Sequence, residues 1–168
     1  DQIEFSIGTQ VLLDKESLTL DKRERLGLLG RNGAGKSTLM RILSGELSSE
    51  DGERWVDPNI TVARLEQALP EHLETSVFDY VATGLAETRA LQSRYHTLAA
   101  DGSAEALEEL SQIQAKLEHL DGWNMEQRIE RVLQQLDLRA DDLLATLSGG
   151  WRRRAALARA LVTEPDVL

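Results

Sequence analysis

Apolar residues follow two different patterns along the chain, and the change comes near Pro70. Before Pro70 they form short runs broken by glycine and polar residues, a texture typical of strands. One stretch departs from it, because residues 38–43 ("TLMRIL") have helical spacing and Gly45 provides a stop signal. The predicted strands are residues 3–7, 11–13, 17–20, 25–29, 55–56 and 60–65.

After Pro70 the apolar positions recur every three or four residues, as in amphipathic helices. Helices are predicted over residues 77–98, 104–120, 125–136 and 151–162, and residues 166–168 look like the start of a strand. The second helix carries a narrow apolar stripe, which predicts an antiparallel hairpin with the first helix through a turn at 99–103. The stripe consists of Leu107, Leu110, Ile113, Leu117 and Leu120.

Composition narrows the class of protein. With 168 residues, 41% of them hydrophobic, the chain is long and apolar enough for one domain, with or without an insertion. A formal net charge of -10 means that any contact with nucleic acid must be local. Cysteine is absent, and His72, His96 and His119 lack metal-ligand spacing, so we expect no disulfide and no metal site built on these residues. No membrane-spanning run or signal pattern is present, and the composition fits a reducing, cytoplasmic compartment.

The clearest chemical motif is the stretch "GRNGAGKS" at residues 30–37, which matches G-x-x-x-x-G-K-[ST]. Glycines at this spacing let the backbone curl so that successive N–H groups point at a polyphosphate, and the following helix adds its positive end. Lysine then reaches the phosphates and the serine hydroxyl ligates Mg²⁺. The alternative is a plain strand-to-helix turn. The predicted nucleotide-binding residues are Gly30, Arg31, Asn32, Gly33, Ala34, Gly35, Lys36, Ser37 and Thr38.

A second glycine motif, "LSGG" at residues 147–150, is ambiguous alone, because Ser148 also suits an ordinary helix N-cap. The order of motifs is more specific. The phosphate loop comes first, then a strand-end glutamine (Gln67 in "ARLEQ"), then "LSGG" followed by "RRRAALARALVTEPDVL". This order resembles the nucleotide-binding domain of the ATP-binding cassette (ABC) family, and the resemblance covers essentially the whole chain.

The resemblance implies an α/β fold of the P-loop NTPase class, with an antiparallel β-subdomain and an inserted helical subdomain. Residues 1–84 would form the nucleotide-binding core, 85–122 a helical arm insertion, and 123–168 the helical subdomain that bears the signature motif. In the family a metal-binding Asp and a water-activating Glu follow the position of Leu168. The C-terminal part of the core would then be missing, both ends look cut, and we expect this stretch alone to be unstable and not to hydrolyse ATP.

Two features narrow the resemblance to the F subfamily, whose members carry tandem cassettes without membrane domains and in many cases act at the ribosome. Trp151 follows "LSGG" where transporter cassettes commonly carry glutamine, and the span from Gln67 to Ser148 contains the extra hairpin. "VARLEQ", "SVFDYVATG" and "RIERVLQQL" are most similar to the first cassette of the Uup branch. The full-length protein would be an ATPase acting on the ribosome or on branched DNA. A transporter's ATP-binding subunit and a non-catalytic dimerisation module are the alternatives.

The resemblance also assigns roles outside the phosphate loop. Ser148, Gly149 and Gly150 would contact the γ-phosphate of ATP held by a second cassette, paired head to tail. Gln67 would sense Mg²⁺ and the attacking water, with Ser37 as the other metal ligand; the alternative is an exposed strand-end glutamine. Phe5 would stack on adenine, and its alternative is ordinary strand packing.

Charge leaves two questions open. Residues 151–160 carry four arginines and no acid, which opposes the helix dipole at an N-terminus, so a solvated face, a partner-cassette contact and RNA binding remain alternatives. Residues 85–122 carry seven acidic residues against three basic ones, a poor footprint for ribosomal RNA. Two interpretations of the hairpin remain: a helical spacer packed on itself, or a local RNA contact through four residues near one helix end. Those residues are Arg89, Arg94, Tyr95 and His96.

Overall fold

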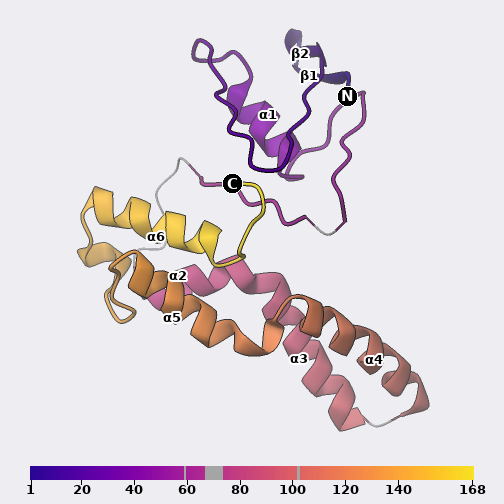
Figure 1. Cartoon of the computed structure of the whole chain (residues 1–168), viewed down its shortest axis with the longest axis vertical. Helices are drawn as coiled ribbons and strands as arrows, with labels where there is room; N and C mark the ends of the chain where they lie inside the picture. The colour runs from indigo at the N-terminus through magenta and orange to yellow at the C-terminus, as the bar shows by residue number, and fades with distance from the viewer. Residues whose placement is uncertain (59, 67–73, 102) are drawn as a thin grey trace. The chain divides into compact units, whose positions relative to one another are not determined.

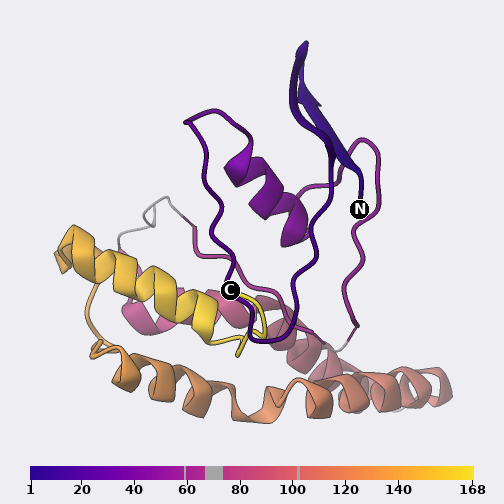
Figure 2. The same ribbon diagram turned by 45° about the horizontal axis from the view of Figure 1, so that its top comes forward.

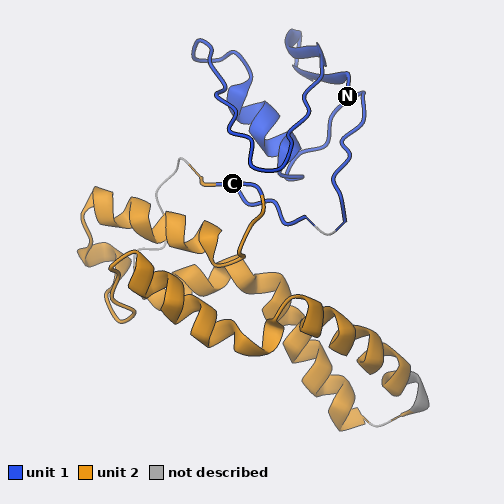
Figure 3. Ribbon diagram, viewed as in Figure 1, with its two compact units in different colours: residues 1–64, 167 blue, residues 65–166, 168 orange. Residues whose placement is uncertain are grey.

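The computed structural model describes residues 1–58, 60–66, 74–101 and 103–168 (Figure 1). The chain forms two compact units, residues 1–64 with 167 and residues 65–166 with 168 (Figure 3). Within the described ranges, no helix combines the length and the apolar character needed to cross a bilayer. The division predicted at 84/85 and 122/123 concerns the family's subdomains and stays a prediction.

Among its described residues, the first unit contains a β-hairpin and one helix (Figure 2). Strands β1 (Ile3–Ile7) and β2 (Gln10–Glu16) pair antiparallel, and α1 spans Lys36–Leu43. The hairpin and α1 share a small core of Ile3, Leu13 and Ile42, with Phe5, Leu39 and Leu47 packed against it. The predicted strands at 3–7 and 11–13 and the helix at 38–43 are therefore confirmed, and Gly45 follows α1 with a φ of +80°.

The strands predicted at 17–20, 25–29, 55–56 and 60–65 are wrong as regular elements. An apolar run becomes a strand only when another strand satisfies its backbone, and none pairs with residues 25–29 in the described part of the chain, where Leu29 is exposed. Residues 60–65 contribute one parallel bridge, between Val62 and Val167. Ala63 N–H donates to the Val167 carbonyl at 2.9 Å, which places the predicted strand start at 166–168 beside this segment.

The second unit is helical. Its elements are α2 (Val77–Ala82), the 3-10 turn η1 (Thr83–Leu85), α3 (Ala86–Asp101), α4 (Ala104–His119), the 3-10 turn η2 (Gly122–Asn124), α5 (Met125–Gln135), the 3-10 turn η3 (Leu144–Thr146) and α6 (Gly149–Leu161). Ser76 caps α2, since its hydroxyl oxygen accepts from Asp79 N–H at 3.0 Å. The helix predicted at 77–98 is interrupted at η1, and the other three predicted helices form within two residues of their expected bounds.

Two separate hydrophobic clusters hold the helical unit together. The main cluster joins α2, α5 and α6 around residues such as Val81, Leu133 and Ala158. The arm cluster joins α3 and α4, and consists of Leu98, Ala106, Ile113 and Leu117 with Leu91, Tyr95 and Leu110 against it. Leu107 was predicted to belong to the stripe but is 59% exposed, because the buried face of α4 runs through Ala106, four residues before Leu110.

The base of the arm hairpin is fixed by a close approach at Gly122. A Cβ there would lie 2.7 Å from Leu117 Cδ2 and 2.9 Å from Thr88 Cγ2. Asp121 adopts a left-handed conformation with a φ of +48°, and Gln92 Nε2 donates to the Gly122 carbonyl at 2.6 Å. The "DGW" sequence therefore ends the hairpin by backbone geometry as well as by composition.

Candidate functional site

The predicted phosphate loop lies in the first unit, between residues 25–29, which are exposed except for the partly buried Leu28, and α1. Gly33 and Gly35 both have a φ of +83°, a conformation that favours glycine. Gly35 is also buried, and a Cβ there would lie 2.9 Å from the Leu12 carbonyl oxygen of β2. The hairpin and the curl of the loop thus both require glycine at this position.

The Lys36 side chain folds back onto the first residues of its own loop. Its Nζ donates to the carbonyls of Gly30 and Arg31, both at 2.7 Å, so the ammonium lies over the start of the motif. The first intrahelical bond of α1 runs from Leu39 N–H to the Gly35 carbonyl at 2.8 Å. The N–H groups of the first turn, including those of Ser37 and Thr38, therefore have no intrahelical partner. With no acid in that turn, the arrangement is suited to an anion.

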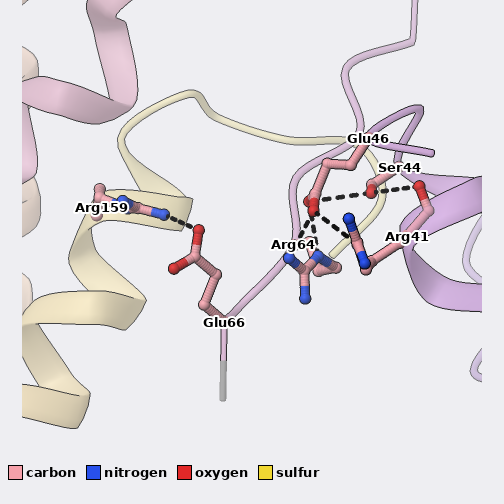
Figure 4. A network of polar contacts seen from close by, with 6 residues as sticks. All are labelled: Arg41, Ser44, Glu46, Arg64, Glu66 and Arg159. Atoms are coloured by element: carbon pink, nitrogen blue, oxygen red, sulfur yellow. Dashed lines mark hydrogen bonds and ion pairs between the residues drawn. The ribbon is translucent and has the colours of Figure 1, made fainter. Parts of the chain in front are cut away.

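The opposite end of α1 is held by arginines and one carboxylate (Figure 4). Arg54 Nε donates to the Leu43 carbonyl at 2.8 Å. Arg64 donates two hydrogen bonds to the Glu46 carboxylate, from Nε to Oε1 at 2.6 Å and from Nη2 to Oε2. Arg41 Nε lies 3.9 Å from Oε2 of the same carboxylate. The Arg64 hydrogen bond lowers the pKa of Glu46. The end of α1 remote from the loop is thereby anchored.

Two predicted site residues outside residues 30–38 stay untested. Phe5 sits in β1, half-buried against the core of the hairpin and α1, so its stacking on adenine stays a prediction. Gln67 falls outside the described residues, and its role toward Mg²⁺ also stays a prediction. Its neighbour Glu66 is described and accepts from Arg159 Nη2 at 2.6 Å (Figure 4).

The signature motif lies in the second unit and begins α6. Ser148 is the N-cap residue, but its hydroxyl makes no capping bond. Gly149 and Gly150 are exposed, neither has a positive φ, and a Cβ on Gly149 would meet nothing within 4 Å. On Gly150 the nearest atom would be Ser148 Oγ at 3.9 Å. The residues that the structure describes give no steric reason for either glycine.

The arginines that follow the motif have different surroundings. Arg152 donates to the carbonyls of Leu144 and Ala145 at 2.9 and 3.1 Å and so fastens η3 to α6. The Arg154 guanidinium lies 4.4 Å from the centroid of the Trp151 ring, a cation–π contact. Arg153 is exposed. Arg154 Nη1 also donates to the Leu136 carbonyl at 3.5 Å. Two of the three arginines thus make local contacts, and the three do not act as a single basic face.

The arm residues considered for a local contact are partly engaged within the hairpin. Arg94 pairs with Glu109 of α4 through two hydrogen bonds of 2.8 and 2.7 Å, which lowers the pKa of the Glu109 carboxyl. Tyr95 belongs to the arm cluster and meets the Trp123 ring edge-on at 5.1 Å. Arg89 and His96 are exposed.

Arg128 is not among the residues predicted from the sequence, yet it is buried in α5 with 5% of its surface exposed. Its Nη1 donates to the Leu120 carbonyl at 2.7 Å and its Nη2 to the Val162 carbonyl at 2.8 Å. The sequence held one signal, because Arg128 lies four residues before the core residue Val132 and therefore on the apolar face of α5.

Comparison with known proteins places these motifs in context. The family model described as "ABC transporter" matches residues 13–168. ATP-binding protein Uup of Haemophilus influenzae is 45% identical over 98% of this chain and 26% of its own length, and Uup of Escherichia coli K12 is 46% identical with the same coverage. The energy-dependent translational throttle protein EttA of Mycobacterium tuberculosis is 32% identical over 96% of the chain and 30% of its own length. The chain thus spans about a quarter of these curated relatives.

Solved structures give the same architecture. A nucleotide-free ATP-binding cassette from an ABC transporter superposes with a TM-score of 0.65 at 22% identity, covering 98% of this chain and 64% of that one. An ATP-binding subunit of an ABC transporter gives 0.64 at 19% identity, with 98% and 61% covered. At such identities the likeness concerns the fold alone.

Proposed function

The chain belongs to the ABC transporter family, and on that premise we propose that residues 30–38 bind the phosphates of ATP. The predicted fold class, a P-loop nucleotide-binding domain of ABC type, is confirmed, as is the resemblance to the F subfamily and its Uup branch. The observation that carries the proposal is the loop itself. Two glycines at positive φ curl it, and Lys36 bridges two of its carbonyls at 2.7 Å.

The residues present fit a nucleotide bound with Mg²⁺. An ammonium has three N–H groups, and Lys36 uses two on the loop, so a phosphate oxygen can take the third. The unbonded first-turn N–H groups of α1 add further donors. The exposed Ser37 hydroxyl would ligate Mg²⁺ together with Gln67, and the metal would offset the charge of the β- and γ-phosphates.

Ser148, Gly149 and Gly150 form the second half of a composite site in this proposal, acting on ATP held by another cassette. The exposed glycines support it, because helix positions without steric need for glycine are explained by a close approach from outside. Two glycines and a hydroxyl at a helix N-terminus leave room and donors for a γ-phosphate. The partner would be a second ABC domain, paired head to tail.

The proposed setting is a tandem-cassette ATPase of the F subfamily, cytoplasmic and without a membrane domain, that couples ATP hydrolysis to work on the ribosome. The name of the EttA relative, a translational throttle, supports the ribosome over branched DNA as the partner. Trp151 after the signature and the arm hairpin of α3 and α4 support this subfamily over a transporter subunit.

The proposal is tested by ATP binding to the full-length protein, measured by calorimetry. Lys36→Ala removes the cation from the loop, and we expect ATP affinity to fall at least about 100-fold, the scale on which a buried charged contact to an anion acts. Lys22→Ala is the matched control, since Lys22 is an exposed lysine of the same unit outside the loop. Unchanged affinity in Lys36→Ala would refute the assignment.

A further inference from the structure

Arg128 of α5 occupies an unusual place for an arginine. It is buried with 5% exposure on the face of α5 that also carries Ile129, Val132 and Leu133 of the main cluster. Its two Nη groups donate to main-chain carbonyls at 2.7 and 2.8 Å, and no ion pair involves Arg128 among the described residues. A buried guanidinium without a carboxylate needs another source of negative charge.

The two carbonyls supply that charge. Leu120 is the C-cap residue of α4, and Val162 is the C-cap residue of α6. Each helix C-terminus carries roughly half a negative charge, so two of them together match one guanidinium. The fork geometry of arginine allows one side chain to serve both ends at once, which a lysine ammonium does not reproduce.

The two helices joined in this way have different roles. α4 is half of the arm hairpin, whose cluster shares no residue with the main cluster. α6 carries Ser148, Gly149 and Gly150 at its other end. Arg128 therefore bonds the base of the arm to the helix that presents the signature motif.

We propose that Arg128 is a positioning residue that couples the arm hairpin to α6, so that nucleotide engaged at the signature motif and the state of the arm influence each other. The inference rests on the proposed function, because it takes the signature motif as the point where nucleotide acts on α6. Coupling of this kind is reciprocal. A nucleotide bound at the signature end should thus alter the last turn of α4, whose final carbonyl is bonded to Arg128.

The test measures amide hydrogen exchange in the full-length protein, with and without the non-hydrolysable ATP analogue AMPPNP and Mg²⁺. Three segments are compared: residues 30–38, residues 149–155 and residues 116–120. In the unmodified protein we expect the analogue to slow exchange in all three, by about fivefold at 116–120. In Arg128→Met the response at 116–120 falls below about twofold, while those at 30–38 and 149–155 remain.

Arg131→Met is the matched control. It removes the same charge from the same helix three residues on, but Arg131 is exposed and pairs with Glu164 at 3.4 Å. All three responses should persist in it. Arg128→Lys serves if Arg128→Met does not fold, since it keeps the charge without the fork and should show the same selective loss at 116–120.

The outcomes separate the two claims. Slowing at 30–38 without any at 116–120 in the unmodified protein overturns the coupling alone, and so does a response at 116–120 that survives in Arg128→Met. A purely structural role would speed exchange in α4 with and without AMPPNP and leave the ratio unchanged, which also contradicts the proposal. No slowing at 30–38 in the unmodified protein refutes the proposed function, and the coupling with it.

Discussion

Helices α1 and α6 both begin with glycines that are assigned to phosphate binding, yet the two sets of glycines have different physical causes. Gly35 before α1 has a φ of +83° and lies against the Leu12 carbonyl, so the fold of its own unit demands it. Gly149 and Gly150 have ordinary φ values and open space around them. The shape of the phosphate loop is thus explained by its own unit, whereas nothing among the described residues requires glycine at the signature end of α6.

The other ends of the same helices are alike. Arg54 Nε donates to the Leu43 carbonyl that ends α1, and Arg128 Nη2 donates to the Val162 carbonyl at the end of α6, both at 2.8 Å. Each helix is therefore held at its C-terminus by an arginine from another part of the chain, which suits the negative end of a helix. The comparison predicts where substitutions harm stability and where they harm only function.

The largest effect on stability is expected from Gly35→Ala. The left-handed backbone costs about 1–2 kcal/mol for a residue with a Cβ, and the contact with a backbone oxygen at 2.9 Å cannot relax by a side-chain rotation. We expect the free energy of unfolding to fall by about 2–4 kcal/mol, measured by chemical denaturation of the full-length protein. Gly27→Ala is the control, because a Cβ there meets nothing within 4 Å. Equal stabilities of the two variants would remove the contrast between α1 and α6.

The second largest loss of stability is expected from Gly84→Ala. Unlike the signature end, the C-terminal end of α6 packs so closely on its neighbour that glycine is needed at position 84. Gly84 lies in η1, and its added Cβ would stand 2.8 Å from Val162 Cγ1 and closer still to the Arg159 carbonyl. Overpacking against backbone should cost about 1–3 kcal/mol of unfolding free energy. Thermal melting monitored by circular dichroism would show it as a lower Tm. A Tm equal to that of the unmodified protein would mean that η1 and α6 can shift to admit the methyl group without loss of stability, which contradicts the prediction.

Gly149→Ala, in contrast to the two preceding substitutions, should not destabilise the protein. A Cβ fits without contact, and alanine in a helix is favoured over glycine by about 0.5–1 kcal/mol, so the unfolding free energy should stay the same or rise by up to that amount. ATP turnover by the full-length protein should nevertheless fall, since the methyl group would stand between the helix and a partner's nucleotide. Melting and phosphate release measured on the same sample test both halves. Destabilisation, or full turnover, would contradict the assignment of the signature end.

The smallest effect is expected at the anchored end of α1, as a function of pH. The Arg64 hydrogen bond lowers the pKa of Glu46 in the folded state, so this pair adds stability above the ordinary pKa of the carboxyl and loses it as pH falls through the lowered value. Glu46 is 40% exposed, so screening should keep the contribution under about 1 kcal/mol. Denaturation between about pH 3 and 6 should show a shallower acid loss in Glu46→Gln than in the control Glu53→Gln. If both variants lost unfolding free energy equally as the pH falls, the Arg64–Glu46 pair would contribute nothing to stability.

The sequence predicts the local elements better than the contacts between them. The phosphate loop, the β1–β2 hairpin and the long helices depend on spacing and on glycine, which are local. Residues 25–29 have a strand-like pattern, but pairing is a property of two segments and the pattern reports only one. The burial of Arg128 was hidden for a similar reason, because its partners lie eight and 34 residues away and are backbone atoms. Leu107 shows that a period of three to four leaves the buried face uncertain by one position.

The arm hairpin has a hydrophobic cluster of its own, separate from the main cluster. Its base is fixed by the close approach at Gly122 and by the bond from Gln92. The far end of the hairpin, beyond this base, can therefore change in length while the main cluster keeps its packing. Only changes near residues 120–122 would reach the bonds that tie the hairpin to α5 and, through Arg128, to α6.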